Sequence, residues 1–385
     1  MAERAELVIL GGGLAGLSLA SRLATSGYGK RVVIVEPRPH YHDDRSWSFW
    51  TPRGSPLAAS ATRTWDRWSF SRLDGAVVSQ RANGWCYAYA RSLDVYQTAL
   101  RAMAARPNIT LWQGTQASEV EARADGFAVQ TNAGLLHARH VVDTRPPPPG
   151  RWSASTLFQS FAGREVRLPR PGFDDGQVEL MTDMRCDSRG FVFSYVLPLS
   201  STRALVEVTR FSTQPIGAPE LSPDLDALAH ARGWTGAEVL RSEAAVLPMG
   251  LPTLPGADRV RGVVSAGIGG GALRAASGYG FLRIQSWAQR CTESLLKDQP
   301  PQGHPAEPLL RRWMDGLFLQ VLARDPRRSP EVFMRLATSV PGPAFVRFLS
   351  DQARWSDYAR VVAALPPAPF LRALQAGRPH SRLTA

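Results

Sequence analysis

Apolar runs and one glycine-rich turn organise the first forty residues. Leu7–Leu10 is a short, continuously apolar run, as expected of a buried parallel strand. A glycine-rich turn occupies positions 11–16, Leu17–Leu23 has a helical pattern, and Val32–Val35 forms a second apolar run that ends in Glu36. This order of strand, turn, helix, strand and acid predicts the first unit of a Rossmann-type domain.

The spacing of the glycines predicts a dinucleotide site. Gly11 allows a tight turn, Gly13 lets the backbone approach a pyrophosphate, and Gly16 lets the helix pack close to the strand. The phosphates are expected on free N–H groups at the helix N-terminus, where the helix dipole favours negative charge. Glu36 is expected to accept hydrogen bonds from the adenosine ribose.

The stretch after Glu36 favours FAD over NAD. It does not continue as regular βαβ units: residues 37–50 are polar and aromatic, and Ser55–Tyr89 alternates like β structure. Two-domain flavoproteins commonly interrupt their nucleotide domain in this way.

Later patterns predict a second domain and a helical end. The expected elements are a helix over Arg91–Ala105, strands at 109–112, 127–131 and 140–142, a proline crossover at 146–149, a β-hairpin over 191–199 and 204–209, and amphipathic helices from 309 to 374. The predicted fold is α/β, with a Rossmann-type FAD-binding domain, an α+β second domain built on an antiparallel sheet, and C-terminal helices. We assign the FAD-binding domain to 1–60, 90–150 and 255–305, the substrate domain to 61–89 and 151–254, and the helical region to 306–378.

A second glycine-rich segment lies at 263–280. So many glycines suggest that the backbone passes close to a flat or charged ligand, and a helix beginning near Gly278 would direct its N-terminus at that ligand. A mobile surface loop is the alternative interpretation. The candidate flavin-binding residues of this segment are Gly267, Gly270, Ser277, Gly278 and Tyr279.

Composition limits the classes of function. The formal charge is +12, but the lysines are only Lys30 and Lys297, so arginine carries nearly all of it, as in a GC-rich coding sequence. We therefore expect no nucleic-acid binding, whereas attraction to anionic lipid stays open. The three cysteines form no CxxC pair, which argues against a structural zinc or a disulfide framework, and we expect no metal site.

The chain shows no stretch near the roughly 18 apolar residues that span a bilayer, and its N-terminus does not read as a signal peptide. We expect a cytoplasmic protein, either free or peripheral to a membrane. The C-terminal helices mix Phe, Leu and Arg, a composition that fits both a membrane-interface face and a helical subdomain covering a core.

Several motifs together resemble the bacterial lycopene β-cyclases, a family of FAD-containing carotenoid enzymes. They occur in the family's order and cover most of the chain: 11–16, Asp-Asp-Arg-Ser-Trp-Ser-Phe-Trp at 43–50, Val-Asp-Thr-Arg-Pro at 142–146, 193–198, 204–209, Leu-Pro-Met-Gly at 247–250, Ser-Gly-Tyr at 277–279 with 283–285, and 317–322. Ser277 replaces the family's usual threonine and keeps the hydroxyl. The match around Asp183 and Arg185 is only approximate.

The resemblance implies a cyclase without net redox change. Its substrate would be lycopene or a related acyclic carotenoid, and its cofactor would be reduced FAD with NAD(P)H as reductant. Its expected partners are the membrane surface and other enzymes of the carotenoid pathway. Glu207 matches the family's essential acid and lies within an apolar strand, where burial raises a carboxyl pKa. An exposed glutamate on an amphipathic strand is the alternative. Trp47, Phe49 and Trp50 are candidates for a substrate tunnel, with core packing as the alternative.

Two other functions stay open. One is a flavin-dependent monooxygenase or isoprenoid reductase of the same fold, although such enzymes usually carry Gly-Asp where this chain has Ala266-Gly267. The other is a non-catalytic carotenoid-binding flavoprotein.

Overall fold

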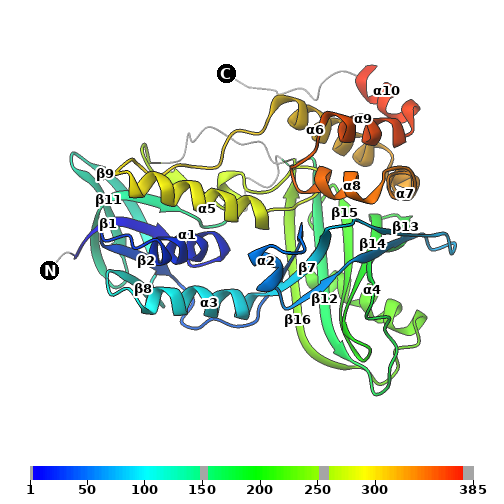
Figure 1. Ribbon diagram of the computed structural model, residues 1–385, viewed down its shortest axis with the longest axis horizontal. Coiled ribbons are helices and arrows are strands. Elements are labelled where there is room, and N and C mark those ends of the chain that lie inside the picture. The colour runs from blue at the N-terminus through cyan, green and yellow to red at the C-terminus, as the bar shows by residue number, and fades with distance from the viewer. Residues whose placement is uncertain (1–2, 148–154, 251–259, 376–385) are drawn as a thin grey trace.

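The computed structural model describes residues 3–147, 155–250 and 260–375. One half, on the left of Figure 1, is a sheet in which β1, β2, β8, β11 and β17 run parallel and β9 and β10 form an antiparallel meander at one edge. Its strands are β1 (Glu3–Leu10), β2 (Val32–Glu36), β8 (Ile109–Gln113), β9 (Ala117–Arg123), β10 (Gly126–Thr131), β11 (Gly134–Asp143) and β17 (Val264–Ser265).

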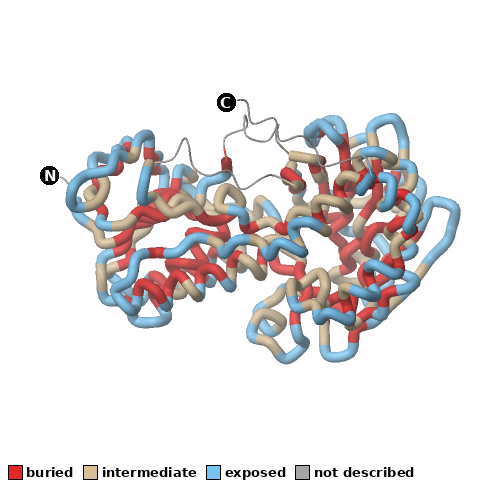
Figure 2. The backbone as a smooth tube through the Cα atoms, turned by 90° about the horizontal axis from the view of Figure 1, so that it is seen from above, coloured by how far each residue is buried: buried red, intermediate tan, exposed pale blue. Residues whose placement is uncertain are grey.

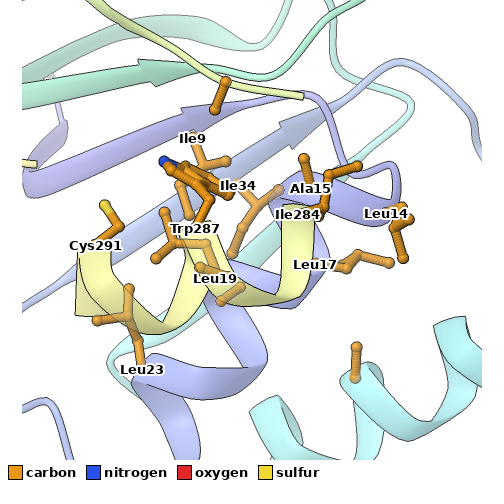
Figure 3. Packing of buried hydrophobic residues seen from close by; sticks show 14 of the residues in the cluster. Ile9, Leu14, Ala15, Leu17, Leu19, Leu23, Ile34, Ile284, Trp287 and Cys291 are labelled. Atoms are coloured by element: carbon orange, nitrogen blue, oxygen red, sulfur yellow. The ribbon is translucent and has the colours of Figure 1, made fainter. Parts of the chain in front are cut away.

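Three helices cover one face of this sheet: α1 (Leu14–Thr25), α3 (Ser92–Ala104) and α5 (Phe281–Leu296). The face is apolar because alternate residues of β1 and β2 point toward the helices. Figure 3 shows Ile9 and Ile34 of the strands packed against α1 and against Ile284, Trp287 and Cys291 of α5. Trp287 and Cys291 are fully buried, so α5 is anchored in this core although it lies more than 250 residues after α1.

The other half is a second seven-stranded sheet in the order β16-β12-β15-β14-β13-β5-β6. Neighbouring strands are antiparallel except for β13 and β5. Helix α4 (Ala218–Ala231) packs on one face. The strands are β5 (Arg67–Ser71), β6 (Val77–Arg81), β12 (Leu157–Arg167), β13 (Val178–Asp187), β14 (Gly190–Ser200), β15 (Arg203–Ser212) and β16 (Glu238–Met249).

A short sheet and the C-terminal helices complete the molecule. The short sheet joins β3 (Ser46–Pro52), β7 (Trp85–Arg91) and β4 (Arg63–Trp65), and α2 (Pro56–Ala59) follows β3. The C-terminal helices lie above the large antiparallel sheet in Figure 1, on the face opposite α4, and buried residues run through the interior of both halves in Figure 2. They are α6 (Leu309–Arg324), α7 (Ser329–Ser339), α8 (Gly342–Leu349), α9 (Trp355–Ala364) and α10 (Pro367–Gln375), with 3-10 turns at Ile268–Gly270 (η2) and Pro326–Arg328 (η3).

Most predicted elements are confirmed. The βαβ unit is β1-α1-β2, the helix predicted at 91–105 is α3, and the predicted hairpin is the antiparallel pair β14-β15. The helix predicted near Gly278 begins three residues later, at Phe281, because the glycine-rich segment continues to Gly280. Parts of the predicted domains lie outside the described residues: positions 1–2, 148–150 and 255–259 of the predicted FAD-binding domain, 151–154 and 251–254 of the predicted substrate domain, and 376–378 of the predicted helical region. Positions 148–149 also belong to the predicted proline crossover.

Candidate active site

The glycine turn between β1 and α1 is tight and closely packed. Gly11 has φ +95°, a conformation that favours glycine. A Cβ on Gly16 would lie 2.0 Å from the carbonyl oxygen of Gly11, so only glycine allows α1 to begin this close to the strand. A Cβ on Gly13 would meet no described atom within 4 Å. The turn is therefore open on the side of Gly13, as a site for a pyrophosphate requires.

The N-terminus of α1 opens on the same side. Gly13 is the N-cap residue of α1. Among the described residues no side chain makes a capping hydrogen bond there, and the first turn of α1 carries no acidic residue. Its N–H groups are thus available to an anion, which the helix dipole attracts. Thr144, just after β11, holds the turn in place, since its Oγ1 lies 2.9 Å from the carbonyl oxygens of both Leu10 and Gly11.

Glu36 lies at the end of β2 and is 3% exposed. It accepts hydrogen bonds from the backbone N–H of Gly12 at 2.6 Å and from Arg38 Nε at 2.7 Å. Burial acts to raise the pKa of Glu36, but the hydrogen bonds and charge of Arg38 outweigh it and hold that pKa below its ordinary value. Sequence reasoning did not identify Arg38 or Tyr41, whose hydroxyl donates to the Gly12 carbonyl at 2.9 Å. Their closeness to Glu36 in the chain was the only available signal.

The second glycine-rich segment connects the two halves. Gly267 (φ +64°) lies beside the start of α1, where its Cβ would be 3.3 Å from that of Ala15. Gly278 (φ +68°) lies on the antiparallel sheet, where its Cβ would be 2.8 Å from Gln159 Oε1. A Cβ on Gly270 would lie 2.5 Å from the Ser265 carbonyl oxygen. The segment is therefore packed against both halves, which contradicts the alternative of a mobile surface loop.

His304 supports this segment and was also missed from the sequence. Its Nε2 accepts the backbone N–H of Gly267 at 3.1 Å, and its ring lies 5.3 Å from that of Trp287. Burial, aided by the charges of Arg290 and Arg283, lowers the pKa of His304 to about 4. The ring is therefore neutral near pH 7, as an acceptor nitrogen must be.

The three candidates for a substrate tunnel, Trp47, Phe49 and Trp50, lie on β3, between the two halves. Phe49 stacks on Phe281 with ring centroids 4.1 Å apart, and Trp47 packs at 6.1 Å from the same ring. Trp50 is 2% exposed and meets Trp68 edge-on at 4.5 Å. Phe49 and Trp50 border a small cavity of about 20 Å³ beside Tyr279, and Trp50 also lines a more open and more polar cavity of about 680 Å³. None of the three lines the large apolar cavity.

The large apolar cavity has a volume of about 370 Å³ and lies between the antiparallel sheet and the C-terminal helices. Its wall includes Ser277 and Tyr279 of the glycine-rich segment and Tyr195 of β14. Other lining residues range from Phe193, which is fully buried, to Trp313 and Leu371, which are each 55% exposed. The cavity thus connects the region of the glycine-rich segment with the surface of the C-terminal helices.

Glu207 lies on β15, directly opposite Tyr195 of β14. Glu207 is half-buried. Burial of its carboxyl group, followed by the negative charge of Glu243, raises the pKa of Glu207 well above its ordinary value, against a weaker opposing effect of Arg241. Glu207 is not among the residues that line the large apolar cavity, but Tyr195, its neighbour on β14, is. A carboxylic acid in such surroundings can act as a proton donor. Glu243 was not identified from the sequence.

Solved structures of similar fold include a reductase-like protein and a flavin-dependent monooxygenase. A geranylgeranyl bacteriochlorophyll reductase-like protein from Thermoplasma acidophilum matches with a TM-score of 0.62 and 14% identity, covering 97% of this chain and 100% of the other. A probable FAD-dependent monooxygenase from Pseudomonas aeruginosa matches with a TM-score of 0.55 and 16% identity, covering 94% and 100%. The fold is thus that of the two-domain flavoproteins, with a Rossmann-type FAD-binding domain and an antiparallel second domain.

Within this class the sequence identifies a narrower group. The profile of the family described as lycopene cyclase protein matches residues 6–375, and the chain belongs to that family. It is 27% identical to the lycopene beta-cyclase of Pantoea ananas, over 96% of this chain and 97% of the other, and 26% identical to that of Pseudescherichia vulneris, over 97% of each. Among the helices of the described residues, none is long and apolar enough to cross a bilayer.

Proposed function

We propose that the chain is a lycopene β-cyclase, which converts the acyclic ends of lycopene into β-rings, by way of γ-carotene to β-carotene, without net redox change. The observation that carries the proposal is the position of Glu207 opposite Tyr195 of the cavity wall, where its raised pKa favours the protonated acid. Family membership supports a carotenoid substrate, since the relatives named above are lycopene beta-cyclases.

Glu207 acts as the general acid. Its O–H bond breaks as a C–H bond forms at the terminal alkene, the resulting carbocation is attacked by a second alkene to close the ring, and a ring proton then leaves. The apolar lining of the cavity disfavours water beside the cation. Aromatic faces can stabilise it by about 1–2 kcal/mol each, and Tyr195, Tyr279 and Phe193 supply such faces along the cavity.

The residues present fit FAD. The open space at Gly13 and the uncapped start of α1 suit a pyrophosphate, and the glycine-rich segment brings backbone from both halves together. When bound in reduced form, with NAD(P)H as the electron source, the flavin would supply negative charge that can stabilise a cation. The ADP end would be held by Gly11, Gly13, Gly16 and Glu36, and the flavin end by Gly267, Gly270, Ser277, Gly278 and Tyr279.

The C-terminal helices would dock on the membrane that holds lycopene. Large apolar side chains are exposed where the cavity reaches the surface, and arginines lie among them in sequence. Apolar side chains interspersed with cations suit the boundary between headgroups and acyl chains. The exposed apolar residues that line the cavity are Trp313, Val362, Leu371 and Leu374.

Purified protein with FAD, NADPH and lycopene in liposomes, kept anaerobic, tests the activity. β-Carotene or γ-carotene is the expected product; oxygenated or more saturated products would favour a monooxygenase or reductase, and unchanged lycopene a carotenoid-binding protein. Glu207→Gln should abolish cyclisation and leave the flavin spectrum intact. Glu179→Gln is the matched control, because Glu179 lies on the same sheet but is paired with Arg232 at 2.8 Å.

A further inference from the structure

Four adjacent strands of the antiparallel sheet place their side chains in one row. Tyr195 of β14 lies opposite Glu207 of β15, Glu207 lies opposite Gly163 of β12, and Gly163 lies opposite Glu243 of β16. Residues paired in this way point to the same face of a sheet. Two glutamates therefore flank one glycine on the face that carries the apolar cavity.

Gly163 creates the space in which the two carboxyl groups meet. A Cβ at this position would lie 2.7 Å from Cγ of Glu207 and 3.4 Å from Cγ of Glu243. Side chains on two strands that flank a common neighbour are usually separated by the side chain of the strand between them. At Gly163 that side chain is missing, so the carboxyl groups of Glu207 and Glu243 face each other across β12, and their proximity contributes to the raised pKa of Glu207.

The two glutamates have unequal surroundings. Glu243 is 6% exposed and accepts hydrogen bonds from Arg241 Nη1 at 2.6 Å and from Ser46 Oγ at 2.7 Å. Arg241 is fixed in turn, since it also donates to Glu165 at 2.8 Å and to the Tyr89 hydroxyl at 2.6 Å. Glu243 therefore has both a cationic partner and a hydroxyl partner.

Glu207 lacks such support. Within the described part of the chain no arginine or lysine lies within ion-pair distance of it, and Tyr195 from β14 is its neighbour on the other side. Two carboxyl groups this close are costly to ionise together. Arg241 bonds to Glu243 and leaves Glu207 without a cationic partner, and the raised pKa of Glu207 favours its protonated form.

We propose that Glu243 is the positioning residue of a one-proton carboxyl pair: as a carboxylate fixed by Arg241 and Ser46, it accepts the Glu207 hydrogen bond and keeps the reactive proton on Glu207. This rests on the proposed cyclase function. When Glu207 protonates the alkene, the charge of the pair changes from −1 to −2 beside the carbocation. The proton released from the ring returns to the pair, so that protons balance and no electrons are exchanged.

The test is the titration of Glu207, followed as the infrared carbonyl stretch of its protonated acid and assigned by its loss in Glu207→Gln. Glu243→Gln keeps the shape of Glu243 and removes its charge. The Glu207 midpoint should fall by about one to three pH units, because Arg241 then acts on it unopposed, and the alkaline limb of cyclisation should move down with it. The other groups facing Glu207, Tyr195 and Arg241, are unchanged.

Two further variants make the result decisive. Glu243→Asp withdraws the carboxylate by one carbon, so the Glu207 midpoint in this variant should lie between those of the wild type and Glu243→Gln. If Glu243→Gln does not fold, Glu243→Asp takes its place in the test. Asp357→Asn removes a buried carboxylate bonded to Arg347 in the C-terminal helices and should leave the midpoint in place. An unchanged midpoint in folded Glu243→Gln, or in Glu243→Asp, would overturn the pair. Because the infrared readout needs no turnover, it tests the carboxyl pair separately from the proposed cyclase activity.

Discussion

Gly163→Ala offers a direct test of the space between the two glutamates. The new Cβ would lie 2.7 Å from Cγ of Glu207, whereas ordinary contacts begin at 3.4 Å, so the Glu207 side chain must recede by about 0.7 Å or adopt another rotamer. A misplacement of about 1 Å in a reacting group can cost about a hundredfold in rate. We therefore expect kcat for cyclisation to fall by about two orders of magnitude.

The same change should cost little stability. Gly163 has no positive φ, so alanine fits the strand, and replacing glycine there recovers about 0.5–1 kcal/mol of chain entropy. Crowding in a packed interior costs about 1–3 kcal/mol. The net loss of unfolding free energy should thus be about 1–2 kcal/mol, measurable by denaturant titration, with flavin content unchanged.

The assay compares kcat, unfolding free energy and flavin content in Gly163→Ala and in Gly29→Ala. Gly29 is the matched control because it is exposed, has no positive φ, and its Cβ would meet no described atom within 4 Å. Near-normal kcat in a folded, flavin-loaded Gly163→Ala protein would refute the argument that catalysis requires this spacing.

Three further predictions follow from other contacts. Gly16→Ala places a Cβ 2.0 Å from the Gly11 carbonyl oxygen, so the purified protein should lose most of its flavin absorbance; normal flavin content would contradict the close packing. Asp357→Asn should cost about 2–3 kcal/mol of unfolding free energy, because Arg347 lowers the pKa of Asp357 to about 2. That difference should hold at neutral pH and shrink as pH falls from about 4 toward 2, and a pH-independent difference would count against the ion pair. Leu371→Glu should weaken binding to anionic liposomes at least tenfold in a flotation assay, since burying a leucine is worth about 1.5–3 kcal/mol, whereas Leu135→Glu on β11 should not; equal binding by both would place the docking surface elsewhere.

Local pattern was sufficient for the nucleotide-binding half. The tight turn, the close helix contact and the terminal acid each follow from a residue type at a fixed spacing, and Gly11, Gly16 and Glu36 occupy the expected positions. The pairing of distant strands could not be read in the same way. Nothing in the alternation of residues 67–71 indicates that β5 lies parallel to β13, which follows more than a hundred residues later.

Glu207 and Glu243 show the same limit within one site. Glu207 was identifiable because it interrupts an apolar strand and matches a family position. Glu243 follows Ser242 and precedes two alanines, a pattern typical of an ordinary edge strand. Its importance arises only from the register of β15, β12 and β16, which brings it to Gly163, and from Arg241 two residues earlier on the same strand.

The acidic pair at 43–44 links the two ends of the candidate site. Asp44 accepts a hydrogen bond from Tyr96 at 3.1 Å and lies 3.4 Å from Arg38, the arginine that holds Glu36. Asp43 pairs with Arg241, the arginine that holds Glu243, at 3.2 Å. Two neighbouring carboxylates therefore contact two different arginines, one beside Glu36 and one beside Glu243. If Glu36 and the proposed carboxyl pair act as inferred above, these two ion pairs tie the nucleotide end of the candidate site to the carboxyl pair, a role that requires no proton transfer by Asp43 or Asp44.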